Sequence, residues 1–348
     1  MLRTRALRTM LIAILVAAVA APAIGSSNTA AQDEQVYLAL GDSIAAGLST
    51  SLPRNRGYPA IIQDLMQAER AGEGAPGAVQ LINLAKPGET TESFIEDGQL
   101  DEALERIAAI ENDSRELRTV TLTIGGNDIL DLWNTAADQR DDGFAAFEQS
   151  FAEIIDELSD ALNGIDADVV VTTYYDLTEG DADVAGSDSW WLAAANDVIR
   201  ETATDAGFDV VDLDELFRGE ITSLTWFPAD VHPNNAGHQV IARAIWQELA
   251  YDEQPPAVEI TRPDSSQVTS RVPTIHAEVS DNVEVERVEL HVDGELVDEL
   301  IYVTRLDAWA GLWDGRDHPG TGVEIEVVAT DLSGNEARDS VSIDLPSR

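Results

Sequence analysis

Four short segments of this sequence carry groups that together suit acyl transfer to a serine. In chain order they are Gly41-Asp42-Ser43, Lys86-Pro87-Gly88-Glu89-Thr90, Gly125-Gly126-Asn127-Asp128 and Asp230-Val231-His232-Pro233-Asn234. A serine hydroxyl is a weak nucleophile until a base removes its proton, and histidine is the side chain that titrates near neutrality. We therefore predict Ser43 as a nucleophile and His232 as its general base. His238 lies inside a predicted helix, where we expect it to pack or face solvent.

The second and third segments suit the oxyanion that forms when a nucleophile attacks an ester carbonyl. Such an oxyanion needs hydrogen-bond donors that are already in place. Gly88 has no side chain, so its N–H can lie close to a ligand. The amide of Asn127 supplies a second donor. We predict an oxyanion hole formed by Gly88, Asn127 and the backbone N–H of Ser43.

Strand-like and helix-like segments alternate from Gln35 to about Tyr251. Short apolar runs predict strands at 36–40, 79–84, 120–124, 169–173 and 208–213, and helical spacing predicts helices over 58–70, 100–110, 144–162, 190–203 and 236–249. This alternation predicts an α/β fold with a parallel sheet covered by helices on both faces. Active sites in such folds lie at the carboxyl ends of the strands. Three of the four segments directly follow predicted strands, and the fourth directly precedes the last predicted helix.

The pattern changes after Gln254-Pro255-Pro256. Beyond it, β-branched alternating runs are separated by turns rich in Gly, Asn and Asp, which predicts an all-β sandwich. We therefore expect a hydrolase domain over 33–252 and a β-sandwich domain over 256–348.

Residues 1–31 have the pattern of an export signal with a short linker. Three arginines precede an apolar run from Met10 to Ala20, and Ala21-Pro22-Ala23 offers a small-residue cleavage site. The run is short for a transmembrane helix, although a retained membrane anchor is the alternative. We expect a secreted, extracellular protein.

The chain is strongly acidic, with 65 Asp and Glu against 21 Lys and Arg and a formal net charge of −44. Such a surface repels nucleic acids and anionic membranes, which excludes both as partners. The charge suits a halophilic protein whose carboxylates are screened by salt; a GC-rich genome is the alternative cause. The chain has no cysteine, so no disulfide is expected. We also expect no cofactor and no metal, since the hydrolase segments lack metal-ligand spacing.

The four segments resemble the SGNH, or GDSL, hydrolase family over roughly Val36 to Leu249. The resemblance implies a three-layer α/β/α, flavodoxin-like fold with a five-stranded parallel sheet. It also implies Ser43 as nucleophile, His232 as base, and Ser43, Gly88 and Asn127 as the oxyanion hole. The sequence departs from the family pattern at Ile44, where the family name has leucine, which is a volume-conserving change.

A second departure concerns the acidic partner of the histidine. The family usually places an aspartate three positions before the histidine, but that position is Ala229 here and Asp230 lies two before. Residues two apart in an extended segment share a face, so Asp230 could orient the ring of His232. The alternative is a backbone carbonyl near Ala229. We predict Asp230 as the third catalytic member.

The C-terminal segment resembles the bacterial immunoglobulin-like modules of secreted enzymes, through residues 274–282 and 328–335. Such a module could contact polysaccharide or a cell surface, or it could be a spacer. Asp281, Asp331 and Asn335 could hold calcium, but Asp and Asn are also ordinary turn formers, and no ion is predicted.

We expect a serine ester hydrolase that cleaves lipid or small acyl esters through an acyl-enzyme on Ser43. The alternative is a polysaccharide acetyl esterase targeted by the C-terminal module. A non-catalytic binding protein is disfavoured because all four segments keep their reactive residues. The intervals 50–57 and 131–142 are predicted to border the substrate pocket, although the sequence carries no code for the acyl length.

Overall fold

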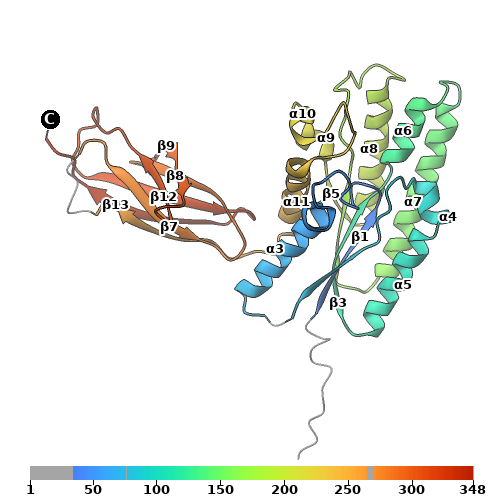
Figure 1. Cartoon of the computed structure of the whole chain (residues 1–348), viewed down its shortest axis with the longest axis horizontal. Helices are drawn as coiled ribbons and strands as arrows, with labels where there is room; N and C mark the ends of the chain where they lie inside the picture. Colours follow the sequence, from blue (N-terminus) through green and yellow to red (C-terminus); the bar gives the residue numbers. More distant parts are fainter. Residues whose placement is uncertain (1–33, 76, 265–269, 348) are drawn as a thin grey trace, which may run out of the picture.

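The structure, a computed structural model, describes residues 34–75, 77–264 and 270–347. It consists of an α/β part and a β-sandwich that lies beside it (Figure 1). The export signal predicted at 1–31 lies outside the described residues. Among the helices of those residues, none is long and apolar enough to cross a membrane.

The centre of the α/β part is a five-stranded sheet with the order β2-β1-β3-β4-β5. Its strands are β1 (Gln35–Gly41), β2 (Val79–Asn83), β3 (Glu116–Thr123), β4 (Asp168–Thr172) and β5 (Asp209–Val211), and all neighbours pair in parallel. Residues Val36 to Leu40 of β1 are fully buried because helices cover both faces of the sheet. The predicted five-stranded parallel sheet is confirmed.

Helices cover the two faces of this sheet in two groups (Figure 1). Helices α3 (Tyr58–Gly72) and α11 (Asn235–Leu249) pack against each other on one face. Helices α5 (Gln99–Asn112), α7 (Arg140–Leu162) and α8 (Asp188–Asp205) cover the other. One face of α7 is buried, as its apolar spacing predicts, through Phe147, Phe151, Ile154, Ile155 and Leu158. The three-layer α/β/α prediction is therefore confirmed.

Five short helices were not predicted, since each has too few residues to show a period. They are α2 (Pro53–Arg56), α4 (Thr91–Glu96), α6 (Gly126–Asn134), α9 (Leu213–Phe217) and α10 (Ile221–Leu224). Helix α4 begins with a capping box in which Thr90 and Ser93 bond each other's backbone N–H. Helix α6 begins directly after β3 and places Asn127 in its first turn.

Two glycines are required where the chain packs most closely near the strand ends. A Cβ on Gly41 would lie 1.9 Å from the carbonyl oxygen of Thr123, and Gly41 also has a φ of +127°. A Cβ on Gly126 would lie 2.3 Å from the ring of Tyr174. Only glycine allows these approaches, so β1 can lie against β3 and α6 against Tyr174.

The sandwich consists of two four-stranded antiparallel sheets, ordered β10-β11-β7-β6 and β13-β12-β8-β9. The strands are β6 (Ala257–Arg262), β7 (Thr274–Ser280), β8 (Val285–Val292), β9 (Glu295–Glu299), β10 (Ile301–Val303), β11 (Ala308–Leu312), β12 (Val323–Asp331) and β13 (Glu336–Ile343). Side chains such as Ile275, Leu290 and Ile325 fill the space between the sheets. The immunoglobulin-like prediction is confirmed.

The sandwich contacts the α/β part through α11. Leu332, in the loop after β12, is fully buried in the core of the α/β part. The indole N–H of Trp246 donates to the Ser333 hydroxyl at 3.0 Å, and Arg243 pairs with Glu284. The two parts therefore share a packed junction in addition to the linking chain.

Candidate active site

Ser43 lies in a tight turn directly after β1. The Asp42 carboxylate accepts a hydrogen bond from the Ile44 N–H at 2.8 Å, which folds the chain back after the strand. Residues 43–49 continue as turns, so Ser43 does not cap a helix. Ser43 is only 6 % exposed.

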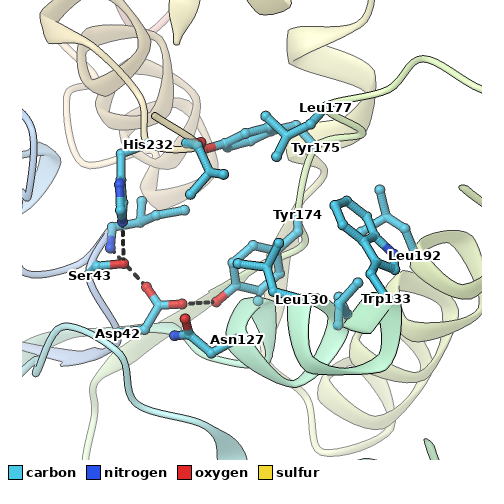
Figure 2. A pocket seen from close by; sticks show the side chains of 14 residues that line it. Asp42, Ser43, Asn127, Leu130, Trp133, Tyr174, Tyr175, Leu177, Leu192 and His232 are labelled. Atoms are coloured by element: carbon cyan, nitrogen blue, oxygen red, sulfur yellow. Dashed lines mark hydrogen bonds between the residues drawn. The ribbon is translucent and has the colours of Figure 1, made fainter. Parts of the chain in front are cut away.

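The Ser43 hydroxyl, the His232 ring and the Asp230 carboxylate form one hydrogen-bonded chain. The Ser43 Oγ lies 2.8 Å from His232 Nε2, and His232 Nδ1 lies 2.5 Å from Asp230 Oδ1. In Figure 2 the His232 ring points directly at Ser43. A ring that donates from Nδ1 to Asp230 leaves Nε2 free to accept the Ser43 proton.

The loop that carries Asp230 and His232 is fixed at three points. The Trp226 N–H donates to the His232 carbonyl at 3.1 Å, and the Tyr175 hydroxyl donates to the Val231 carbonyl at 2.7 Å. The Asn234 side chain caps α11 by accepting from the N–H groups of Ala236 and Gly237. The strand ends and a helix start thus hold His232 over Ser43.

Asp230 has a second partner that sequence reasoning missed. The Ser49 hydroxyl donates to Asp230 Oδ2 at 2.6 Å, and the Trp226 indole N–H donates to the Ser49 carbonyl at 2.9 Å. Burial would raise the pKa of Asp230, but the hydrogen bonds from Ser49 and His232 outweigh it and lower the pKa. Asp230 is therefore ionised at neutral pH. The His232 ring bonds this carboxylate, which favours Asp230 over the carbonyl near Ala229.

Besides the Ser43 N–H, the predicted oxyanion donors are Asn127 and Gly88, and only Asn127 lines the cavity next to Ser43. Asn127 borders the same cavity as Ser43, and its Nδ2 donates to the Glu89 carbonyl at 2.8 Å. An amide nitrogen carries two protons, so one remains for a ligand. Gly88, with a φ of +87°, lies in the loop between β2 and α4 but does not line this cavity. The geometry thus supports Asn127 more directly than Gly88.

The carboxylates of Asp42, which is buried, and Asp128, which is half-buried, link the loops around the site. Asp42 Oδ2 accepts from the Tyr174 hydroxyl at 2.7 Å. Burial raises the pKa of Asp42 to about 6, although the bonds from Tyr174 and Ile44 act against it. Asp128 accepts from both the N–H and the hydroxyl of Thr91, which joins α6 to α4. Both aspartates thus shape the loops around the site.

An apolar cavity of about 280 Å³ opens beside Ser43 and His232. Apolar and aromatic side chains form most of its wall: Ile129, Leu130, Trp133, Tyr174, Tyr175, Leu177 and Leu192. Figure 2 shows Trp133 and Leu192 at the end away from Ser43. Trp133 falls in the predicted border 131–142, whereas no residue of 50–57 lines this cavity. Such a wall suits an apolar group attached to the carbonyl that Ser43 attacks.

His238, the other histidine of the α/β part, has no place in the site. It is fully buried, and its Nδ1 accepts from the Tyr58 N–H at 3.2 Å. Burial lowers the pKa of His238 to about 4, so the ring is neutral at physiological pH. His238 therefore packs in the interior, which is one of the two roles that the sequence predicts for it.

A parallel sheet with a serine–histidine pair at its carboxyl edge is the arrangement of a serine hydrolase. Residues 39–240 match the model of the GDSL-like lipase/acylhydrolase family, and residues 256–327 match that of a bacterial Ig domain. The chain belongs to the GDSL-like lipase/acylhydrolase family. It is therefore a carboxylic ester hydrolase, with a bacterial Ig domain after the hydrolase fold.

Three known proteins resemble this chain at low sequence identity. An uncharacterised protein of Bacillus subtilis, YpmR, is 22% identical over 240 residues, which cover 66% of this chain and 86% of that protein. The structure of Axe2, an acetylxylan esterase from Geobacillus stearothermophilus, is 18% identical with a TM-score of 0.47 and covers 62% of this chain and 94% of its own. The esterase EstA from Pseudoalteromonas sp. is 17% identical with a TM-score of 0.39, covering 61% and 94%.

Proposed function

We propose that this protein is a secreted serine esterase that cleaves carboxylic esters with an apolar acyl chain through an acyl-enzyme on Ser43. One observation carries the proposal. The Ser43 hydroxyl is hydrogen bonded to His232, and both side chains border a mainly apolar cavity. A nucleophile with its base at the edge of an acyl-sized cavity is what ester cleavage requires.

The first half of the reaction transfers the acyl group to Ser43. His232 Nε2 takes the hydroxyl proton while Ser43 Oγ attacks the ester carbonyl carbon. The negative charge on the carbonyl oxygen is stabilised by the Ser43 N–H and the free amide proton of Asn127. Gly88 stays a predicted third donor. His232 then gives its proton to the leaving alcohol, and the Ser43 ester remains.

The second half reverses these roles with water. His232 removes a proton from a water molecule, which attacks the acyl carbon, and the same donors bind the new oxyanion. The proton returns to Ser43 Oγ as the acid leaves. Asp230 acts as a positioning residue throughout, since its carboxylate fixes the ring and stabilises the imidazolium.

The cavity favours an acyl chain of several carbons. An acetyl group would place one methyl in a space of about 280 Å³ and leave Leu130, Trp133 and Leu192 without contact. Each methylene that is buried there contributes about 0.8 kcal/mol. Longer acyl chains should therefore be better substrates until the cavity is filled. Polysaccharide acetyl esters, the alternative, use little of this cavity.

A panel of p-nitrophenyl esters with increasing acyl length, together with acetylated xylan, tests this proposal. We expect kcat/KM to rise by roughly fourfold for each added methylene from the acetate to the hexanoate. Leu130→Trp, which fills the cavity, should remove that rise and spare the acetate. Leu216→Trp is the matched control, because Leu216 lies on α9 at the surface and is 37% exposed.

Two results would argue against an acyl-binding cavity. One is a kcat/KM that is highest for the acetate in the wild-type protein, with efficient cleavage of acetylated xylan. The other is an equal effect of Leu130→Trp and Leu216→Trp across the panel. The first result would favour the polysaccharide acetyl esterase.

Export and adaptation to salt belong to the same proposal. The arginines and apolar run before Ala21 support export, and the net charge of −44 supports a saline habitat. The hydrolase limits at 33–252 and the sandwich limits at 256–348 also stay predictions.

Repulsion between surface carboxylates weakens as salt screens it. We expect the thermal midpoint to be higher in molar NaCl than in 0.05 M NaCl; an unchanged or lower midpoint would contradict the halophilic prediction.

A further inference from the structure

Three aspartates meet where the α/β part joins the sandwich. Asp252 follows α11, Asp281 follows β7, and Asp331 is the last residue of β12. One carboxylate oxygen of each residue lies within 4.8 Å of the corresponding oxygens of the other two. The group thus combines one residue from the linker of the α/β part with two from the sandwich.

One oxygen on each of two of these carboxylates has no hydrogen-bond partner. Asp252 Oδ2 and Asp281 Oδ2 are both buried, and neither finds a donor in the part of the chain that the structure describes. The Asp252 side chain is nearly inaccessible, since the residue is only 4% exposed, and Asp331 is fully buried. Burying a carboxylate oxygen without a hydrogen-bond donor lowers the stability of the folded state. We therefore expect these two oxygens to have a further partner.

The other oxygens are already engaged in a way that fixes the three carboxylates. Asp252 Oδ1 accepts from Asn282 Nδ2 at 3.1 Å, and Asp281 Oδ1 accepts from the Val283 N–H at 2.8 Å. Asp331 Oδ1 accepts from the Asn335 N–H at 2.9 Å. All of these donors are neutral groups. They orient the carboxylates but do not balance three negative charges.

We propose that Asp252, Asp281 and Asp331 bind one Ca²⁺ ion at this junction. Ca²⁺ is a hard cation that takes carboxylate and other oxygen ligands in a flexible geometry. The ion would satisfy the two free oxygens and offset the repulsion between the carboxylates. Because its ligands come from both sides of the junction, it stabilises the docked arrangement of the sandwich on the α/β part.

Hydrogen bonds around the three carboxylates also indicate that the ion site is preformed. Asn335 Nδ2 donates to both the Asp252 carbonyl and Asp331 Oδ2, each at 2.9 Å, and so ties the two sides together. Hydrogen bonds of this kind orient ligand carboxylates around an ion. The packing is also close, since a Cβ on Gly72 would lie 2.4 Å from the Cβ of Asn282.

Calorimetric titration of the full chain with CaCl₂, after treatment with EGTA and dialysis, tests the proposal. We expect one saturable site in 0.5 M NaCl, where weak binding to surface carboxylates is screened. Asp252→Asn and Asp281→Asn should each lower the affinity by at least about tenfold. Asp314→Asn is the matched control, because Asp314 is an exposed sandwich carboxylate paired with Arg316. It should leave the site intact.

Thermal unfolding gives a second readout that a purely structural aspartate would not show. In EGTA, Asp252→Asn should unfold at or above the wild-type temperature, because the change removes an unpaired buried charge. In 5 mM CaCl₂ the order should reverse, since only the wild-type protein gains the ion. The proposal is overturned if the wild-type chain shows no saturable site, if both variants keep it, or if Asp314→Asn loses it equally.

Discussion

Ser43→Ala is expected to lower kcat for p-nitrophenyl esters on the order of 10⁵-fold. The variant keeps the cavity and the loops but has no oxygen that could form the acyl-enzyme. Any remaining rate would come from oxyanion donors and substrate binding alone. Initial-rate kinetics on a short ester measure the effect, with circular dichroism as the check that the variant is folded.

The double variant adds a test that Ser43 and His232 act as one unit. His232→Ala, and His232→Ala combined with Ser43→Ala, should fall to about the same residual rate, because neither group works without the other. Ser51→Ala is the control, since Ser51 is an exposed serine that bonds Asn235 and lies outside the cavity. A folded Ser43→Ala variant with near wild-type activity would refute the proposed nucleophile.

Asp230→Asn is expected to lower kcat by about a thousandfold. The amide cannot stabilise a charged imidazole ring as the carboxylate does, and its NH₂ group can favour the wrong ring tautomer. We expect a smaller loss than for a fully buried triad aspartate, because the Asp230 side chain is 39% exposed and water screens its charge. Kinetics with a short ester measure the change in kcat.

Two further variants separate positioning from a general loss of charge. Ser49→Ala should lower kcat by about tenfold, because it removes the only one of the three hydrogen bonds to the Asp230 carboxylate that does not come from His232 itself. Asp197→Asn removes an exposed carboxylate paired with Arg200 and should have no effect. If Asp230→Asn retains activity within a few-fold of wild type, a main-chain group rather than Asp230 orients the ring.

The long apolar and amphipathic segments made most of the fold predictable. The run Val36 to Leu40 ends at Gly41, and the apolar stripe of α7 faces the sheet, so period and length alone indicate a covered parallel sheet. Active sites in such a sheet lie at the carboxyl ends of its strands. The segments that hold Ser43, Gly88, Asn127 and His232 could therefore be predicted to lie together. Short helices such as α4 and α6 were not predictable, because capping and close packing define them more than any period.

Several contacts in the site depend on residues far apart in the chain. Ser49 reaches Asp230 and Tyr174 reaches Asp42 across 181 and 132 positions, and no local pattern indicates such pairs. Trp133 could be placed only in an interval, since pocket walls have no sequence code. For the junction, the sequence showed Asp281 and Asp331 as turn formers. Asp252, the third carboxylate, became visible only when the two parts were packed together.

Covalent labelling tests the central claim most directly. The folded wild-type protein is treated with a fluorophosphonate, which reacts with an activated serine hydroxyl, and the modified peptide is identified by mass spectrometry. The proposed relay through His232 predicts one equivalent of label on Ser43, and loss of ester hydrolysis in proportion to labelling. Absence of labelling in the folded, active protein, or a label on another residue that abolishes activity, would contradict the proposed mechanism.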